Sequence, residues 1–410
     1  MNTYTETNRR CPVCVSDSSQ PVFEFAGIPL GDNFTDSSLE AKEQLELPLH
    51  LLLCTNCFHL FLPNVVNPDL SYLKYHFRSS TSPGLRESMR TSHQYLRSLS
   101  GDNLRRVVDI GANDGTWLSL FGSTGAETLG VEPSPDHWTE LENSNHHVYR
   151  GYFDKEAVDY IENWLDGSDL DLVTINNTLS NISDIRQTFE SFRRLDTGNT
   201  LFSIITGYHF DQFHANMFDY IYHEHLSYFS VSNLMRLAQE FGFKNFDVRR
   251  FPLKGGSIQF TFSTRNHVTL ASADAYRLCL WEEWIQQEPT LFATKLQRDF
   301  KTFCDKVSGH FTTLRNHKPR VVGYGYSHSV ATLMRVSNIA EGLSRIVDDN
   351  TDRQGKYTPG HGFLIEAPDT IDPTLDGVFI LAWQHSALIE RQLKKLNGKV
   401  SFASPFGSYL

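Results

Sequence analysis

Residues 105–121 read RRVVDIGANDGTWLSLF, and this stretch decides the fold. Its apolar run predicts a buried strand, DIGANDG predicts a glycine turn, and the following residues predict a helix. The next segment, ETLGVEP (127–133), predicts a second strand that ends at Glu132. This order of strand, glycine turn, helix and acid-terminated strand is typical of the first unit of a nucleotide-binding α/β sheet.

The residues of the turn are those that a bound nucleoside requires. Asp109 stands at the end of the first strand, and Gly111 and Gly115 allow a tight turn that a ligand can approach closely. Asn113 tolerates a positive φ almost as glycine does. Glu132 ends the next strand, where a carboxylate can accept both ribose hydroxyls of an adenosine. An ordinary tight turn is the alternative, and the acid in register favours the cofactor site.

Two adenosine cofactors suit this geometry, NAD and S-adenosylmethionine. The loop lacks the third glycine of GxGxxG, which packs the helix closely and presents its N-terminus to a pyrophosphate. Because S-adenosylmethionine has no pyrophosphate, the sequence favours a methyltransferase over a dinucleotide oxidoreductase.

Outward from this unit, the chain continues as an α/β protein. Residues 84–99 and 271–317 have helical periodicity, and further strands are expected at 171–177, 200–206 and 255–263. After Pro319, RVVGYGYSHSVATLMRV (320–336) again predicts strand, GxG turn and helix, with strands in RIVDDN and GVFILAW. These patterns predict a second, smaller Rossmann-like domain.

The N-terminal region carries two CxxC pairs, Cys11 with Cys14 and Cys54 with Cys57. Each pair can close one turn around a metal, and together they offer zinc four thiolates in a closed tetrahedral site. A single pair could instead be a redox dithiol or two buried small side chains. Two pairs in one small module favour structural zinc.

Residues 218–230, FDYIYHEHLSYFS, concentrate titratable side chains. His223 and His225 would point the same way on an extended strand, whereas the zinc-protease pattern HExxH requires a helical turn between its histidines. A hydrogen-bonded cluster under an aromatic patch is the structural alternative. The segment follows the fourth strand and so approaches the ligand edge of the sheet. This position favours proton abstraction, with His225 as base, Glu224 as its partner and Tyr222 as a hydrogen-bond donor.

Composition limits the partners. At 410 residues the chain is expected to form two or three domains. The net charge of -11 argues against nucleic acid and anionic membranes as partners. The first ten residues, MNTYTETNRR, lack the apolar core of a signal peptide, and no apolar stretch is long enough to span a bilayer. A cytoplasmic protein is expected.

An ordered series of motifs then resembles one family, the bacterial sugar C-methyltransferases that act on nucleotide-linked 4-keto-deoxyhexoses in deoxysugar biosynthesis. The motifs are CPVC, CTNC, SSTS (79–82), DIGANDG, GVEPS (130–134), NNTLSNISDI (176–185), YHEHLSYFS, LKGGSIQFTF, GYG (323–325), VDDNTDRQGKYTPG (347–360) and LAWQH (381–385). The resemblance covers the chain from Cys11 to its last strands.

The resemblance implies three parts: a zinc-binding module (1–70), a methyltransferase domain that binds S-adenosylmethionine (71–310), and a Rossmann-like domain that helps hold the nucleotide sugar (311–410). In this family a base removes the proton beside the sugar ketone, and the enolate attacks the sulfonium methyl. His225 matches the base, and Tyr222 and Glu224 match residues that shape the site. Asn177 is expected at the cofactor. Substrate contacts are expected from Ser79, Lys254, Gly256, Tyr324 and Gly325.

The chain departs from the family pattern on the substrate side. Phe77 replaces a tyrosine, Asn181 replaces a histidine, and Lys254 replaces the histidine before the GG pair. The third glycine loop continues with Tyr326, Ser327, His328 and Ser329 in place of small residues and lysine. These changes leave open an O- or N-methyltransferase, or a protein that binds sugar nucleotides without turnover.

Overall fold

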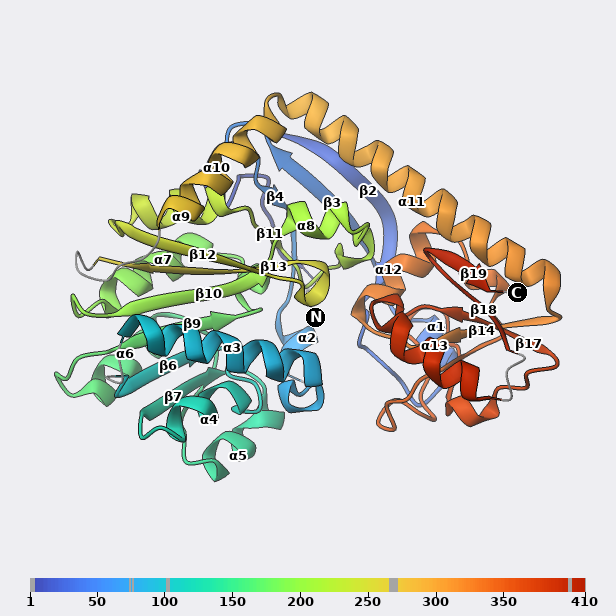
Figure 1. Ribbon diagram of the computed structural model, residues 1–410, viewed down its shortest axis with the longest axis horizontal. Coiled ribbons are helices and arrows are strands. Elements are labelled where there is room, and N and C mark those ends of the chain that lie inside the picture. The colour runs from blue at the N-terminus through green and yellow to red at the C-terminus, as the bar shows by residue number, and fades with distance from the viewer. Residues whose placement is uncertain are drawn as a thin grey trace. The chain divides into compact units, whose positions relative to one another are not determined.

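The computed structural model describes residues 4–73, 75, 77–100, 104–264, 272–396 and 400–409 (Figure 1). Contacts within the chain divide it into two compact units, each with its own sheet. Unit 1 comprises Met1–Gln20, Leu52–Ala215 and Glu224–Phe292, and unit 2 comprises Pro21–Leu51, Asn216–His223 and Ala293–Leu410.

The main sheet of unit 1 has seven strands among the described residues. In their order across the sheet these are β12 (Asn245–Phe251), β13 (Ser257–Ser263), β10 (Leu201–Gly207), β9 (Leu172–Asn176), β6 (Arg106–Ile110), β7 (Glu127–Glu132) and β8 (His147–Arg150). The five strands from β10 to β8 are parallel, and β13 runs antiparallel to both β10 and β12. Their apolar runs are buried because helices cover both faces of a parallel sheet.

The helices of unit 1 are α2 (Asp69–Tyr72), α3 (Pro83–Ser100), α4 (Thr116–Gly122), α5 (Pro135–Asn143), α6 (Lys155–Leu165), α7 (Ile185–Leu195), α8 (His209–His214), α9 (Val231–Glu240) and α10 (Ser272–Gln286). Helices α3, α4 and α5 share one buried cluster that includes Met89, Trp117 and Leu141. Helices α6 and α9 each contact α7, and α9 also contacts β13. The sheet therefore has a helical layer on each side.

The order of the strands fixes the ligand edge of unit 1. From β6 the chain moves through β7 to β8 on one side, and then crosses back to β9 on the other side. Open α/β sheets bind ligands at the carboxyl ends of the strands where the order reverses in this way. In unit 1 that point lies between β6 and β9.

The N-terminal region forms two small sheets in the described ranges. One pairs β1 (Tyr4–Thr7) with β5 (Asn64–Val66), and the other orders β11 (Ser227–Tyr228), β4 (Leu60–Phe61), β3 (Glu46–Cys54) and β2 (Ser19–Pro29). The sequence indicated short pieces here, yet β2 has 11 residues and β3 has 9. Pairing in a shared sheet explains their length. The neighbouring strands supply hydrogen-bond partners for backbone N–H and C=O groups, even where proline and polar residues look like strand breaks in the sequence.

Unit 2 contains a second open sheet. In the described residues its order is β16 (Ile365–Glu366), β15 (Arg345–Val347), β14 (Arg320–Tyr324), β17 (Asp376–Ile380), β18 (Ser401–Ser404) and β19 (Gly407–Tyr409). All neighbours are parallel except β18 and β19. The expected second Rossmann-like α/β domain is confirmed, and its strand order reverses at β14.

The helices outside the main sheet of unit 1 are α1 (Ser38–Lys42), α11 (Pro289–His317), α12 (His328–Val336) and α13 (Ser386–Lys395). No helix in the described ranges is both long enough and apolar enough to cross a bilayer.

Most expected elements of the main sheet are confirmed, and β12 was missed. Its sequence, NFDVRRF, carries three charged residues, so its apolar content is low. Pairing with β13 along its whole length holds it in the sheet. The strand expected from residue 255 begins at Ser257, because Gly255 ends a short 3-10 turn and Gly256 follows it.

Candidate functional site

A cavity of about 330 Å³ opens at the carboxyl ends of the strands of unit 1. Its size falls within the usual range for small-molecule sites. Seven of the expected site residues line it: Ser79, Asp109, Gly111, Asn113, Glu132, Asn177 and Lys254. Segments far apart in the chain therefore contribute to one site, as expected where the strand order reverses.

Glu132 lines the cavity, and two backbone amides hold its carboxylate. The Asn113 N–H donates to Oε2 and the Ser134 N–H donates to Oε1, each at 2.8 Å. Burial raises the pKa of the carboxyl, although these hydrogen bonds oppose the shift. Asn113 adopts a φ of 52°, as its place in the turn predicted. Each carboxylate oxygen keeps a lone pair for a ligand hydroxyl.

Gly111 is required by its surroundings. Its φ is 75°, and a Cβ added there would lie 2.3 Å from the Thr178 hydroxyl oxygen. The glycine thus lets the loops after β6 and β9 approach each other. Gly115 is the residue before α4, and it does not line the cavity.

Asp109 positions a second polar group. Its Oδ1 accepts hydrogen bonds from the Thr174 hydroxyl at 2.6 Å and from Asn176 Nδ2 at 3.2 Å. Burial raises the pKa of Asp109 well above its ordinary value. The buried Asn176 Oδ1 has no hydrogen-bond partner within the described part of the chain, and Asn176 lines the cavity. An orphaned acceptor at this place fits a ligand that donates a hydrogen bond.

The lining also includes three of the residues that depart from the family pattern: Phe77, Asn181 and Lys254. Phe77 lies near the Glu132 carboxylate, because its carbonyl accepts from Asn113 Nδ2 at 2.9 Å and the Asn113 N–H donates to Glu132. Ser79 lies beside them, and its backbone N–H donates to Asn113 Oδ1 at 2.9 Å. Gly256, also expected at the substrate, does not line the cavity. The space for a Cβ at Gly256 is taken by the Asp211 Cβ, 2.2 Å away.

The YHEH segment is a turn, and the division between the units falls within it. Tyr222 and His223 belong to unit 2, and Glu224 and His225 belong to unit 1. In unit 2, the Tyr222 ring centroid lies 5.8 Å from that of His328, and His223 Nε2 lies 3.2 Å from the Leu47 carbonyl oxygen.

Within unit 1, His225 is half-buried and does not line the cavity. It directly precedes Leu226 and β11, and β11 lies beside the 3-10 turn Leu179–Asn181. Glu224 Oε1 accepts a hydrogen bond from the Ser71 hydroxyl at 3.3 Å. Ser71 lies in α2 next to Tyr72, which does line the cavity, and burial followed by the Glu224 charge raises the pKa of Tyr72. The segment thus adjoins the elements that line the cavity.

In unit 2 the expected substrate residues lie where the strand order reverses. Tyr324 ends β14, and its hydroxyl donates to the Asp349 carboxylate at 3.2 Å. Gly325 follows, and a Cβ there would lie 2.4 Å from the Ala382 Cβ. The loops after β14 and β17 therefore meet closely.

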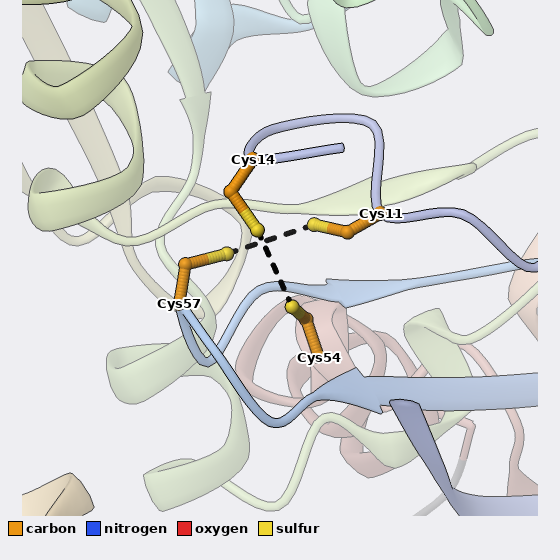
Figure 2. Close-up of side chains that lie close together, drawn as sticks. All are labelled: Cys11, Cys14, Cys54 and Cys57. Atoms are coloured by element: carbon orange, nitrogen blue, oxygen red, sulfur yellow. Dashed lines mark hydrogen bonds between the residues drawn. The ribbon is translucent and has the colours of Figure 1, made fainter. Parts of the chain in front are cut away.

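The four N-terminal cysteines converge in unit 1 (Figure 2). Their Sγ atoms lie within 4.8 Å of one another, with Cys11 to Cys57 at 3.6 Å and Cys14 to Cys54 at 3.5 Å. None forms a disulfide. A tetrahedron with metal–sulfur distances of about 2.3 Å has edges of roughly 3.8 Å, so the cluster has the size of a zinc site.

The two CxxC turns share one local geometry. The Val15 N–H donates to the Cys11 carbonyl at 2.9 Å, and the Phe58 N–H donates to the Cys54 carbonyl at 3.0 Å. Val15 and Phe58 also share a positive φ, 56° and 57°. This repeated turn points the two thiolates of each pair toward one centre, as the sequence predicted.

A buried hydrogen-bond chain joins the cysteine cluster to β11. Asn233 Nδ2 donates to the Cys57 carbonyl at 2.9 Å, and Asn233 Oδ1 lies 3.1 Å from His59 Nδ1. Because an amide oxygen only accepts, His59 carries its proton on Nδ1, and its Nε2 accepts from the Ser227 hydroxyl at 3.1 Å. Burial lowers the pKa of His59 to about 4. The chain ends in the strand that directly follows the YHEH segment.

Sequence reasoning missed several lining residues, including Asn176, Thr178, Tyr152 and Phe153. Asn176 and Thr178 flank the expected Asn177 at the end of β9. Their position at the carboxyl end of a parallel strand could have identified them as lining residues. Tyr152 and Phe153 follow β8, a four-residue strand that was not expected. Its brevity left no periodic pattern to detect.

Three family models match consecutive parts of the chain. Residues 11–72 match the family model described as "Putative zinc binding domain", residues 84–248 match "Methyltransferase domain", and residues 252–405 match "C-methyltransferase C-terminal domain".

Individual relatives were also found. The C-methyltransferase NovU of Streptomyces niveus is 25% identical over 406 residues, which cover 96% of this chain and 94% of NovU. The structure of an S-adenosylmethionine-dependent methyltransferase from Archaeoglobus fulgidus aligns with a TM-score of 0.37 at 16% identity. The alignment covers 43% of this chain and 94% of that one. The magnesium protoporphyrin IX methyltransferase of Synechocystis PCC 6803 aligns with a TM-score of 0.36 at 11% identity, covering 45% and 84%.

Proposed function

We propose that this chain, which is an S-adenosylmethionine-dependent methyltransferase carrying a C-methyltransferase C-terminal domain, methylates the carbon beside the ketone of a nucleotide-linked 4-keto-deoxysugar. The observation that carries the proposal is the cavity of unit 1. Its lining includes Glu132, proposed for the adenosine, together with Ser79 and Lys254, proposed for the acceptor.

The residues present fit the cofactor. Glu132 presents a buried carboxylate for two ribose hydroxyls, and Asn176 Oδ1 is a buried acceptor that lacks a partner among the described residues. Gly111 keeps the floor of the cavity open to a ligand, and Asn177 lies at the end of β9 beside it. Bound S-adenosylmethionine supplies an electrophilic methyl group on a sulfonium.

The protein's own part in the reaction is to form and hold a nucleophilic carbon. His225 takes the proton from the carbon beside the ketone, the electron pair of that C–H bond forms a C=C bond, and the carbonyl π pair moves to oxygen. Glu224 orients the imidazole, and Tyr222 serves as a hydrogen-bond donor. The ketone makes the proton acidic, so the protein need only position the base and stabilise the oxyanion. Within unit 2, Tyr324 and Gly325 are the residues proposed to contact the nucleotide sugar.

The proposal is tested by calorimetry. The protein is titrated with S-adenosylhomocysteine, and then with dTDP, GDP and CDP in its presence. Micromolar binding of the first and selective binding of one nucleotide are expected. Cofactor binding without any nucleotide binding would contradict the sugar assignment and direct attention to methylation of a heteroatom in another acceptor.

Replacing Glu132 by alanine is expected to weaken binding of S-adenosylhomocysteine by roughly 100-fold. The reason is the loss of two hydrogen bonds to a charged group, each contributing about 1.5 kcal/mol. The matched control is Glu127→Ala at the other end of β7, where an exposed carboxylate pairs with Arg106 at 3.2 Å. Calorimetry measures both variants. An unchanged affinity in Glu132→Ala would show that the adenosine lies elsewhere.

A further inference from the structure

Lys254 lines the cavity of unit 1 and has no counter-ion among the described residues. Of the described residues that line the cavity, it alone carries a Lys or Arg side chain. Within the described ranges its ammonium takes part in no hydrogen bond or ion pair, whereas its backbone carbonyl accepts from Gln212 Nε2 at 3.3 Å. A partly desolvated charge in this position is stabilised by a ligand that carries negative charge.

The acidic groups of the cavity are already engaged. Asp109 accepts from Thr174 and Asn176, and Glu132 accepts from two backbone amides. Asp184 caps α7 by accepting from the Gln187 N–H at 2.9 Å. None of these carboxylates forms an ion pair with the lysine.

Helices α3 and α8 pack against the turn Leu253–Gly255, and neither brings a free acid to the lysine among the described residues. Asp211 of α8 approaches Gly256 but is paired with Arg250. Helix α3 presents Leu85 and Met89 to the cavity. Its charged residues near this end, Arg86, Glu87 and Arg90, are exposed.

The backbone fixes Lys254 where glycine or asparagine would be easier to accommodate. Its φ of 50° and ψ of 41° are left-handed, a conformation that a lysine rarely adopts. Leu253 packs on the core beside α3, and Gly255 and Gly256 follow. The turn itself does not require a lysine, so we infer that the ammonium of the side chain has a function.

The strand order places Lys254 far from the adenosine end. The turn precedes β13, and Ser257 of β13 pairs with Gly207 at the carboxyl end of β10. Glu132 ends β7, and the order between them is β13, β10, β9, β6, β7. At about 4.8 Å per strand, the two positions are roughly 19 Å apart. This separation favours a role for Lys254 away from the ribose.

We propose that Lys254 is a catalytic residue whose ammonium donates a hydrogen bond to the acceptor's ketone oxygen and stabilises the enolate. This inference rests on the proposed function. As the base takes the proton, the C–H electron pair forms the C=C bond and the carbonyl π pair moves to oxygen, beside the ammonium. When the carbon bonds to the methyl group, the S–CH₃ bond breaks, its electron pair stays on sulfur and the carbonyl re-forms.

The protonation state agrees with this role. Burial lowers the pKa of Lys254 to about 8. At pH 7 roughly nine in ten of the side chains are then protonated, so the group acts as a cation and not as the base. Burial raises the pKa of Tyr72 and of Tyr152, two phenols that line the cavity, so neither titrates in this range.

The experiment follows enolate formation alone. With S-adenosylhomocysteine bound no methyl can be transferred, and exchange of solvent deuterium beside the ketone of 4-keto-6-deoxyglucose linked to dTDP, GDP or CDP is measured by NMR. Lys254→Met is expected to slow exchange by about 10²–10³-fold, the effect of removing one oxyanion donor. Lys254→Arg retains the charge and should recover most of the loss. Lys244→Met, at an exposed lysine just before β12, is the control with unchanged exchange.

The pH profile supplies an independent readout. Wild-type exchange should fall as the pH rises through about 8, because the ammonium loses its proton there. Lys254→Arg should lack this fall, since a guanidinium stays protonated. Affinity for S-adenosylhomocysteine should change less than about threefold in both Lys254 variants, which also shows that they are folded.

Two results would overturn the inference while leaving the proposed function intact. One is a rate of deuterium exchange in Lys254→Met that equals the wild-type rate. The other is a large loss of S-adenosylhomocysteine affinity with normal exchange at saturation, which would assign the lysine to the cofactor's carboxylate. Absence of exchange in the wild-type protein with all three sugars would overturn the proposed function itself, and the inference with it.

Discussion

Replacing His225 by alanine is expected to reduce methyl transfer by about 10²–10⁴-fold, the usual contribution of a general base. Deuterium exchange beside the ketone should fall equally, because both reactions require the same proton transfer. Affinity for S-adenosylhomocysteine should stay within about threefold, because His225 does not line the cavity that contains Glu132.

The position of His225 supports this expectation. The ring is half-buried, and its centroid lies 6.3 Å from that of Tyr228 in an edge-on arrangement. The Leu226 carbonyl accepts from the Leu62 N–H at 2.9 Å, which fixes the backbone directly after the histidine. The neighbouring Glu224 Oε2 is buried and lacks a hydrogen-bond partner in the described part of the chain, so it remains able to accept one.

A matched control and a rescue separate chemistry from structure. His214→Ala removes an exposed histidine at the end of α8 and should leave exchange unchanged. Added imidazole should restore part of the exchange in His225→Ala, since a small base can enter the space left by the side chain. Exchange in His225→Ala within threefold of wild type would remove His225 from the role of base.

Loss of the metal is the second large effect expected. Cys11→Ser should release zinc and unfold the N-terminal module, measured by metal analysis together with circular dichroism. Structural zinc contributes about 10–16 kcal/mol to a small site, whereas a whole domain is stable by about 5–15 kcal/mol. The module therefore has too little other stabilisation to stay folded without the metal.

Loss of zinc should also disturb the YHEH segment. Strand β4 lies between the cysteine cluster and β11, with Phe61 paired to Ser227. The chain through Asn233 and His59 reaches the same serine. Exchange should accordingly fall in the zinc-depleted protein at a temperature where the main sheet of unit 1 remains folded.

Cys279→Ser is the control for the metal, because this half-buried cysteine lies in α10 outside the cluster. It should keep one equivalent of zinc and normal exchange. A full equivalent of zinc in Cys11→Ser would show that the four-cysteine assignment is wrong. Normal exchange in zinc-free protein would show that β11 is held without the module.

The sequence alone determined the features that depend on local chemistry. The two CxxC pairs specified four thiolates, because three-residue spacing closes a knuckle whatever lies around it. Asp109, Gly111 and Glu132 were recognisable since a strand, a positive-φ turn and a strand-end acid fall within one short unit. The second sheet followed from the same pattern after Pro319.

The tertiary structure alone decided how distant segments combine. Phe77, Asn181 and Lys254 meet in one cavity because the carboxyl ends of parallel strands share one edge, which sequence separation does not reveal. Only the fold showed that Lys254 has no acidic partner among the described residues. The nearby acids have other partners, because Asp211 pairs with Arg250 and Glu132 accepts from the Asn113 N–H. Local sequence specifies turns and ligand spacings through short-range sterics, whereas charge balance in a cavity is set by residues that folding brings together.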